Sequence, residues 1–197
     1  MNKLTNFLKE LVSLLITMAV MLLAMKLFFY YVAEPFIVDG RSMDTTLESG
    51  ERLLMLKNNA IERFDVVVFP SPTNPNKLYI KRVIGIPGDK LEVKDDQLIL
   101  NGKAMDEPYL KQKQAEIEGD FTFDFTLQNA TGKEVIPEGK YFVMGDNRRN
   151  SLDSRSFGYI DSDSVIGEAD VIHWPFDKMK LLSQYSLNDD GTAIIEE

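Results

Sequence analysis

The feature that most constrains this chain is a long apolar run near its N-terminus. Residues 11–25 read LVSLLITMAVMLLAM without a charge, and after Lys26 the run continues as LFFYYVA to Ala33. A helix that crosses a bilayer needs roughly 20 apolar residues, and the long stem of a lysine can carry its ammonium to the interface. The run therefore predicts a transmembrane helix over residues 11–33, with an aromatic belt at residues 28–31.

Two other interpretations of this run fit less well. A cleaved secretory signal needs small residues at an A-x-A-like site, but bulky Tyr31 and charged Glu34 flank the candidate Ala33. The helix of a soluble domain is usually apolar on one face, whereas this run is apolar all round and ends in aromatic residues. We therefore expect a membrane anchor.

The charges on either side of the run predict its orientation. Lys3 and Lys9 precede it, whereas Glu34 and Asp39 follow it. Because cytoplasmic flanks are enriched in Lys and Arg, we expect a cytoplasmic N-terminus at residues 1–10. The same rule places the domain that follows, residues 34–182, outside the cell membrane. A polar C-terminal tail is expected at residues 183–197, frayed over residues 187–197.

Composition excludes several classes of protein. The chain has no cysteine, which rules out disulfides, a cysteine nucleophile and cysteine-ligated zinc or iron–sulfur clusters. Its one histidine, His173, lacks partner ligands and is expected to be structural. A net charge of −9 argues against nucleic acid as a partner. No phosphate-binding loop or metal-ligand spacing occurs, so we expect no metal and no cofactor.

After the anchor, short apolar segments alternate with turns rich in Gly, Pro, Asn and Asp. This pattern predicts a mainly β fold built from antiparallel sheets, and the polar stretch 111–119 is expected to be a loop. The segments expected to be strands are residues 66–69, 78–86, 90–93, 97–100, 121–127, 141–144 and 165–174.

With no cysteine and one histidine, a hydrolase of this composition would use Ser or Thr activated by Lys, paired carboxylates, or an oxygen-ligated metal. Ser42 stands at the start of the body, and Lys81 lies inside an apolar segment where strand alternation gives it the same face as Tyr79 and Val83. Burial lowers the pKa of a lysine, and a neutral Lys81 could then accept the proton of Ser42. Spacing alone is weak support, because most loop serines are turn residues and most strand lysines pair or reach solvent.

Four ordered motifs strengthen this hypothesis, because together they resemble the bacterial type I signal peptidases in their short, single-anchor Gram-positive form. They are residues 40–47 (GRSMDTTL), 63–69 (RFDVVVF), 79–89 (YIKRVIGIPGD) and 145–155 (GDNRRNSLDSR). One such motif would be weak, whereas four in order behind an anchor are specific.

The resemblance implies a membrane-bound serine endopeptidase that cleaves signal peptides from exported preproteins after small residues. Its partners would be preproteins and the lipid bilayer, with the secretion machinery nearby. The resemblance also implies an antiparallel body with an insert around residues 101–137. It implies roles for ten residues: Ser42 as nucleophile, Lys81 as general base, Ser151 as the residue that orients Lys81, Asp153 and Arg155 as a supporting ion pair with Asp146 nearby, and Phe36, Val38, Met43 and Ile80 as the wall of the substrate pocket.

The chain departs from the family at two positions. Gly40 stands where some members place a serine hydroxyl as a second oxyanion donor, so the oxyanion should rest on the Ser42 backbone N–H, other backbone groups or water. Thr45 replaces a proline that is usual in the family, which is expected to loosen the turn after Ser42.

Two alternatives belong to other functional classes. A catalytically inactive relative that serves in pilus assembly or as a chaperone would be expected to lack Ser42 or Lys81, and both are present. A self-cleaving repressor with a similar Ser-Lys body would carry a DNA-binding helix pair where this chain has an apolar run. Asp153 and Arg155, taken alone, would fit a solvated surface pair.

Overall fold

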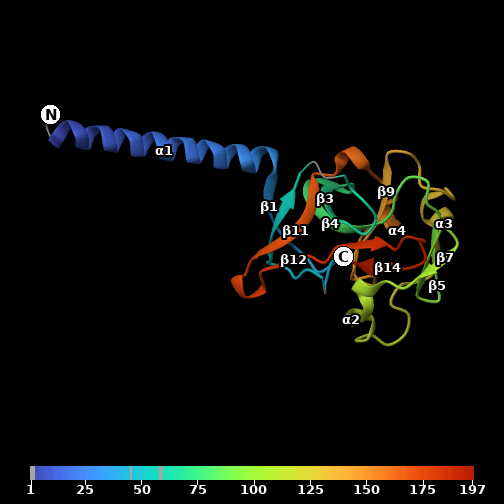
Figure 1. Ribbon diagram of the computed structural model, residues 1–197. Coiled ribbons are helices and arrows are strands. Elements are labelled where there is room, and N and C mark those ends of the chain that lie inside the picture. The colour runs from blue at the N-terminus through green and yellow to red at the C-terminus, as the bar shows by residue number, and fades with distance from the viewer. Residues whose placement is uncertain (1–2, 45, 58–59) are drawn as a thin grey trace. The chain divides into compact units, whose positions relative to one another are not determined.

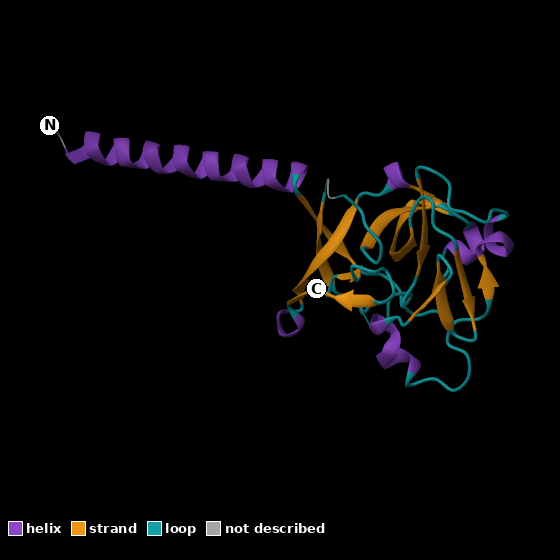
Figure 2. Ribbon diagram, turned by 45° about the vertical axis from the view of Figure 1, so that its right-hand side comes forward, coloured by secondary structure: helices purple, strands orange, loops and turns teal. Residues whose placement is uncertain are grey.

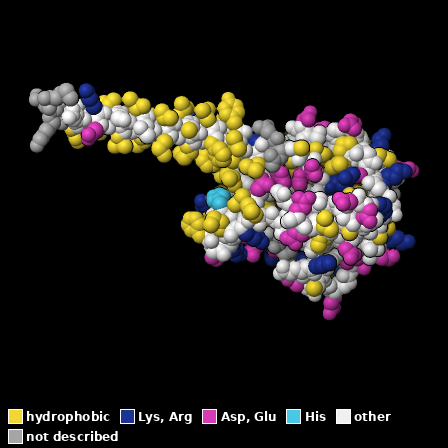
Figure 3. Space-filling view, viewed as in Figure 1, with side chains coloured by type: hydrophobic (Ala, Val, Ile, Leu, Met, Phe, Trp, Pro, Cys, Tyr) yellow, Lys and Arg dark blue, Asp and Glu magenta, His cyan; other side chains and the backbone are white. Residues whose placement is uncertain are grey.

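The first unit of the molecule is one long helix. The computed structural model describes residues 3–44, 46–57 and 60–197, and the chain divides into two units, residues 1–34 and 35–197. Helix α1 (Lys3–Tyr31) begins before the expected span and ends two residues earlier, because Ala33 starts strand β1 (Ala33–Ile37) (Figure 1). Within α1, residues Thr5–Tyr31 are long and apolar enough to cross a membrane, and Figure 3 shows apolar side chains along its length.

The second unit is built mainly from antiparallel sheet, which confirms the predicted fold class. The larger sheet has the strand order β1-β2-β11-β3-β4-β9-β10, with β12 beside β11. The pairs β2–β11, β11–β3, β3–β4, β4–β9, β9–β10 and β11–β12 are antiparallel. Its further strands are β2 (Arg52–Leu56), β3 (Val66–Ser71), β4 (Asn74–Gly85), β9 (Lys140–Met144), β10 (Ile160–Asp161), β11 (Gly167–Trp174) and β12 (Lys180–Leu181).

A smaller sheet is inserted between β4 and β9. Its order is β7-β6-β5-β8, made of β5 (Leu91–Lys94), β6 (Gln97–Leu100), β7 (Lys103–Met105) and β8 (Phe125–Thr126). The insert therefore begins earlier than the expected residue 101, because β5 and β6 pair with β7 and β8 rather than with the larger sheet. The short helices of the body, shown in Figure 2, are η1 (Pro108–Leu110), α2 (Lys111–Gln114), α3 (Leu127–Thr131), α4 (Ser154–Phe157), η2 (Ser162–Ser164) and η3 (Phe176–Lys178).

Strand β3 shows why the larger sheet is covered on both faces. Val66 and Val68 belong to one hydrophobic cluster, whereas Val67 and Phe69 belong to another. Successive side chains of a strand point to opposite faces, so each face of β3 packs against its own core. The continuous apolar sequence of β3 follows from this double burial. In the neighbouring strand β4, residues 80–85 are buried, whereas residues 74–78 are exposed.

The expected strand at residues 121–127 is wrong for most of its length, since only Phe125–Thr126 form a strand. Phe121 is buried but Phe123 is 63% exposed, so the alternation seen in the sequence does not correspond to two faces. The backbone N–H groups of Phe121 and Thr122 donate to the carboxylate of Asp96, at 3.0 and 2.6 Å. A side chain thus takes the place of a neighbouring strand.

The prediction of a frayed tail is also wrong where the structure has strands, at residues 185–187 and 194–196. Strands β13 (Tyr185–Leu187) and β14 (Ile194–Glu196) form an antiparallel hairpin, and Ile194 is buried in the same cluster as residues of the smaller sheet. The apolar residues of this segment form two short groups, residues 185–187 and 193–195, separated by polar residues; they pack once the hairpin forms. The expected loop at residues 111–119 likewise begins with the one-turn helix α2.

Candidate active site

Ser42 and Lys81 meet at one edge of the larger sheet's core. Ser42 lies in the turn after β1, where Gly40 adopts a positive φ of 107°, a conformation that favours glycine. Lys81 lies within β4, opposite Val67 of β3, and its side chain is buried. Lys81 Nζ donates to Ser42 Oγ at 2.7 Å and to the Ile80 carbonyl at 2.9 Å.

The environment of Lys81 changes its protonation. Burial lowers the pKa of Lys81 from 10.5 to about 8, while the nearby carboxylates of Asp153 and Asp146 act in the opposite direction. Tyr79 lies on the same face of β4, with its ring centroid 5.1 Å from Nζ, as strand alternation predicts. With a pKa near 8, about a tenth of the molecules carry a neutral amine at pH 7, compared with fewer than about one in a thousand for an ordinary lysine.

Asp153 and Arg155 form the expected ion pair, with an Arg155 Nη2–Asp153 Oδ2 distance of 2.7 Å. Asp153 is fully buried and also accepts the backbone N–H of Gly145 at 3.0 Å, so the pair is not a solvated surface contact. Although burial is the largest effect and raises the pKa of Asp153, the hydrogen bond and charge of Arg155 help to lower that pKa overall. The Asp153 carboxylate therefore keeps its negative charge near Lys81.

Asp146, expected near the Asp153–Arg155 pair, forms an ion pair with Arg82. Its carboxylate accepts two hydrogen bonds from Arg82, at 3.0 and 2.7 Å, and one from the Thr46 hydroxyl at 2.6 Å. Arg82 is fully buried, with its guanidinium carbon 4.1 Å from the ring centroid of Tyr109. Arg82 was not among the predicted site residues, although an arginine inside an apolar strand segment is the kind of signal that marks such a pair.

Ser151 does not make the expected bond to Lys81. Its hydroxyl is buried and has no well-aligned hydrogen-bond partner in the described part of the chain. It nevertheless lies close enough to Asp153 to help lower the pKa of that carboxyl. A Cβ atom placed on Gly145 would lie 2.7 Å from Ser151 Cβ and would also clash with the Ser42 carbonyl. Gly145 therefore lets Ser151 and the nucleophile turn approach each other.

The four expected pocket residues lie together. Val38, Met43 and Ile80 are buried in one hydrophobic cluster, and Phe36 packs against it while remaining half-buried. Met43 directly follows Ser42, and Ile80 directly precedes Lys81. The cluster therefore adjoins both of these residues. A substrate side chain that enters here meets an apolar and closely packed wall.

The two departures from the family have different outcomes. A Cβ on Gly40 would meet open space, and the Ser42 backbone N–H donates to no acceptor recorded for the described residues. No described acceptor therefore competes for that N–H. Thr45, expected to loosen the turn, lies outside the described residues.

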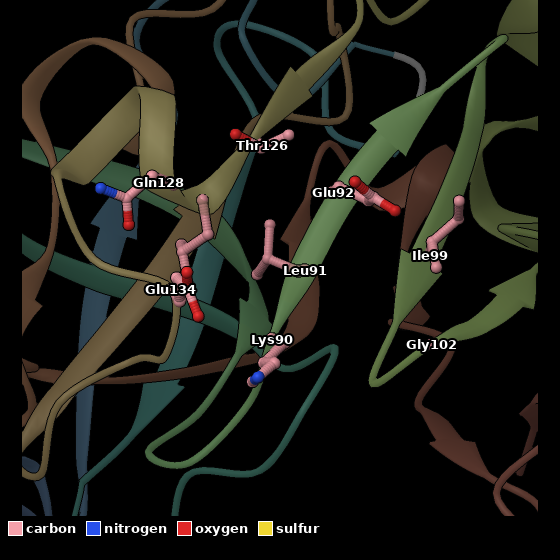
Figure 4. A pocket seen from close by; sticks show the side chains of 9 residues that line it. Lys90, Leu91, Glu92, Ile99, Gly102, Thr126, Gln128 and Glu134 are labelled. Carbon is pink, nitrogen blue, oxygen red and sulfur yellow. The ribbon is translucent and has the colours of Figure 1, made fainter.

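A separate cavity of about 280 Å³ lies on the smaller sheet. Figure 4 shows that its lining comes from strands β5, β6 and β8 and the segment that follows them, and it includes Lys90, Glu92 and Glu134. None of the predicted site residues lines it, so we do not assign it to the reaction. Among the described residues, no group of three His, Cys, Asp or Glu side chains could hold a metal ion.

Comparison with known proteins agrees with this geometry. The profile of the family described as "Signal peptidase, peptidase S26" matches residues 8–174. The chain belongs to this signal peptidase family. Signal peptidase IB of Staphylococcus aureus (strain MRSA252) is 42% identical over 193 residues, which cover 93% of this chain and 98% of the relative. Signal peptidase I of Bacillus caldolyticus is 46% identical over 151 residues, covering 74% of this chain and 82% of the relative.

A solved structure supports the same family. The crystal structure of a signal peptidase I from Enterococcus faecalis V583 is 43% identical to this chain, with a TM-score of 0.54, and it covers 56% of this chain and 97% of its own. As a signal peptidase, the chain is a serine endopeptidase, and preproteins with signal peptides are its substrate class. An inactive pilus-assembly or chaperone relative is not favoured.

Proposed function

We propose that Ser42 and Lys81 form the catalytic dyad of this signal peptidase. The observation that carries the proposal is the 2.7 Å contact between Lys81 Nζ and Ser42 Oγ, made by a lysine that is buried. The 2.7 Å contact is short enough for proton transfer between the two side chains, and burial lowers the pKa of Lys81 to about 8. Both requirements of a Ser-Lys pair are therefore supported.

The reaction follows from these positions. Neutral Lys81 takes the hydroxyl proton as Ser42 Oγ attacks the carbonyl before the scissile bond, and the Ser42 N–H stabilises the oxyanion. As the C–N bond breaks, the Lys81 ammonium returns its proton to the leaving amine. Lys81 then removes a proton from the water that attacks the acyl-enzyme, and the ammonium protonates Ser42 Oγ as it leaves.

Three residues are proposed to support the dyad without reacting. Asp153 and Arg155 hold the end of β9 through the Gly145 N–H, and the negative charge that remains limits how far the Lys81 pKa falls. Ser151 is proposed to orient Lys81 during turnover, because its buried hydroxyl makes no hydrogen bond of accepted geometry within the described chain.

Cleavage is proposed to require a small residue just before the cut and another two residues upstream. The support is the buried apolar wall formed by Val38, Met43 and Ile80 next to the dyad. A peptide series tests this, and Ala→Phe just before the cut should lower kcat/KM at least tenfold. Equal cleavage of the Phe peptide and its parent would contradict the pocket assignment.

Helix α1 is proposed to anchor the enzyme in the cell membrane with its N-terminus in the cytoplasm and residues 35–197 outside. The apolar length of Thr5–Tyr31 supports the anchor. A bilayer partner also fits the exposed apolar residues at the turn that joins β11 to β12 and at the adjoining strand ends, which are Trp174, Phe176, Met179 and Leu181. Preproteins delivered across the membrane by the secretion machinery would then meet the dyad on the outer side.

The dyad is tested by incubating the purified full chain with a preprotein and sequencing the new N-terminus. Ser42→Ala and Lys81→Ala should each abolish cleavage, because removing either member of such a unit costs about as much as removing both. Lys94→Ala is the matched control, since Lys94 also lies on a strand but is exposed. Full-rate processing by a folded Ser42→Ala or Lys81→Ala variant would refute the dyad, and binding of preprotein without cleavage by the native chain would favour the inactive relative.

A further inference from the structure

Asn147 contacts the nucleophile turn on both sides of Ser42. Its backbone N–H donates to the Ser42 carbonyl at 3.0 Å, and its side-chain amide donates to the Arg41 carbonyl at 2.9 Å. The Arg41 carbonyl belongs to the peptide unit before the Ser42 Cα, and the Ser42 carbonyl belongs to the unit after it. One residue therefore holds both of the peptide planes whose rotations define φ and ψ of the nucleophile.

The side-chain contact has a specific consequence for the Ser42 N–H. In a trans peptide the C=O and N–H bonds point in opposite directions, so a donor on the Arg41 carbonyl directs the Ser42 N–H away from Asn147. That N–H donates to no acceptor recorded for the described residues. We propose that Asn147 is a positioning residue that aims the Ser42 N–H at the oxyanion, an inference that rests on the proposed Ser42 mechanism.

Asn147 is itself firmly held. It is buried, its carbonyl accepts the N–H of Asn150 at 2.9 Å, and it follows Asp146, which is fixed by Arg82. The Arg82–Asp146 pair thus connects strand β4, which carries Lys81, to the residue that holds Ser42. Arg82, next to Lys81 on β4, thus binds Asp146, and the next residue, Asn147, holds the peptide units on both sides of Ser42.

The contacts also distinguish Asn147 from a residue that touches the substrate. Its amide is already engaged with the Arg41 carbonyl, and its effect on the reacting atoms passes through the Ser42 peptide. Preorganised N–H donors lower the barrier because they need no reorientation when charge develops on the oxyanion. Asn147 should therefore affect kcat while leaving the binding of the substrate unchanged.

The test replaces the side-chain donor while keeping the backbone N–H. Asn147→Asp is isosteric but presents a carboxylate to the Arg41 carbonyl, and Asn147→Ala removes the contact. Removing a complete oxyanion donor costs about 100-fold to 1,000-fold in kcat, so misdirecting one should cost roughly 10-fold to 100-fold. KM should stay within about twofold. The apparent pKa of the acid limb should not move in Asn147→Ala, because no charge changes, whereas the added carboxylate of Asn147→Asp should raise it as Asp146 and Asp153 do; kcat is therefore compared on the high-pH plateau.

A peptide aldehyde gives an independent measure, because its adduct with Ser42 carries the oxyanion. Its affinity should fall by the same factor as kcat/KM in both variants, whereas affinity for the peptide product should not change. Each variant is assayed about 10 °C below its own unfolding midpoint, so lost stability is separated from lost catalysis. Asn147→Ser, which retains a short donor, serves as a second test and should lose less than Asn147→Ala.

Asn101→Asp is the matched control. The Asn101 amide donates to Asp89 at 2.8 Å and accepts the Lys90 N–H at 2.8 Å, away from the dyad, so this variant should lose stability but keep kcat. Unchanged kcat and aldehyde affinity in Asn147→Asp and Asn147→Ala would overturn the inference, as would an equal kcat loss in Asn101→Asp. Either result leaves the dyad standing if Ser42→Ala remains inactive, whereas activity in Ser42→Ala would refute the proposed function itself.

Discussion

At the scale of single residues, the chemistry depends on how a lysine is kept both buried and near opposite charge. Burial removes water from the Lys81 ammonium and lowers its pKa, while Asp153 and Asp146 limit the shift. Without the carboxylates, a neutral Lys81 would be a weaker base, and without burial the amine would be protonated at neutral pH. The pKa of about 8 is a balance between these effects.

The pH dependence of kcat/KM should show this balance. Activity requires Lys81 without its extra proton, so kcat/KM should rise with pH through an apparent pKa of about 8 and fall about tenfold per pH unit well below it. Lys81→Arg should be inactive at every pH, because a guanidinium does not deprotonate in this range. Lys81→His should retain at most a trace of activity, because an imidazole can lose its proton at lower pH than an amine. A profile that is flat from acid to neutral pH would mean that another group accepts the proton.

Gly145 is expected to be as sensitive as a catalytic group although it carries no side chain. Gly145→Ala would place a methyl group 2.7 Å from Ser151 Cβ and against the Ser42 carbonyl. Such overpacking costs roughly 1–3 kcal/mol, and here it displaces the nucleophile turn, so kcat should fall at least tenfold. Gly132→Ala is the control: its Cβ would meet open space, but its positive φ of 77° strains an alanine, so this variant should lose stability and keep kcat. Equal kcat losses in the two variants would contradict this explanation.

At the scale of elements, strand β4 organises the site by presenting adjacent charged residues to opposite faces. Lys81 faces Tyr79 and Ser42, whereas Arg82 faces Asp146 and Tyr109. A strand does this at no extra cost in backbone conformation, because its side chains alternate by construction. Reaction and support are thus separated by the sheet while remaining one residue apart in the sequence.

The C-terminal hairpin offers a direct test of packing at the element scale. Adjacent residues of β14 differ in environment, since Ile194 is 8% exposed and Ile195 is 45% exposed. Ile194→Ala should lower the free energy of unfolding by roughly 2 kcal/mol, whereas Ile195→Ala should change it by less than about 0.5 kcal/mol. Denaturant unfolding followed by tyrosine fluorescence measures both, and equal effects would mean that the hairpin is frayed in solution.

At the scale of the whole molecule, the chain combines an apolar helix with a body that has its own core. The helix exposes apolar side chains such as Leu14, Met21 and Leu22, an arrangement that is stable in lipid but not in water. Residues 35–197 form a separate compact unit. With the proposed anchor in the membrane, lipid would stabilise helix α1, whereas core packing stabilises residues 35–197.

Orientation can be measured because the chain has no cysteine. Single substitutions Asn6→Cys and Lys133→Cys place one thiol before and one after the apolar run at residues 11–33, Lys133 being an exposed residue of the body. In intact cells, a membrane-impermeant maleimide should label Lys133→Cys and leave Asn6→Cys unlabelled until the cells are lysed. Labelling of Asn6→Cys alone in intact cells would reverse the proposed topology.

Local sequence by itself determined the parts of this protein that depend on composition within a short window. The apolar run predicts a spanning helix wherever the rest of the chain lies, the absence of cysteine removes whole classes of chemistry, and alternation places Lys81 and Tyr79 on one face. The ordered motifs identified the residues that should matter. These inferences need only neighbours in the sequence.

Tertiary structure alone decided which partner each charged or polar side chain takes. Arg82 pairs with Asp146 across 64 residues, and Asn147 reaches Arg41 across 106 residues. The strand predicted at residues 121–127 fails because Asp96 binds the backbone of Phe121, and the predicted frayed tail packs because Ile194 finds a core. Such contacts depend on the register and packing of distant segments, which hydrophobic periodicity does not encode.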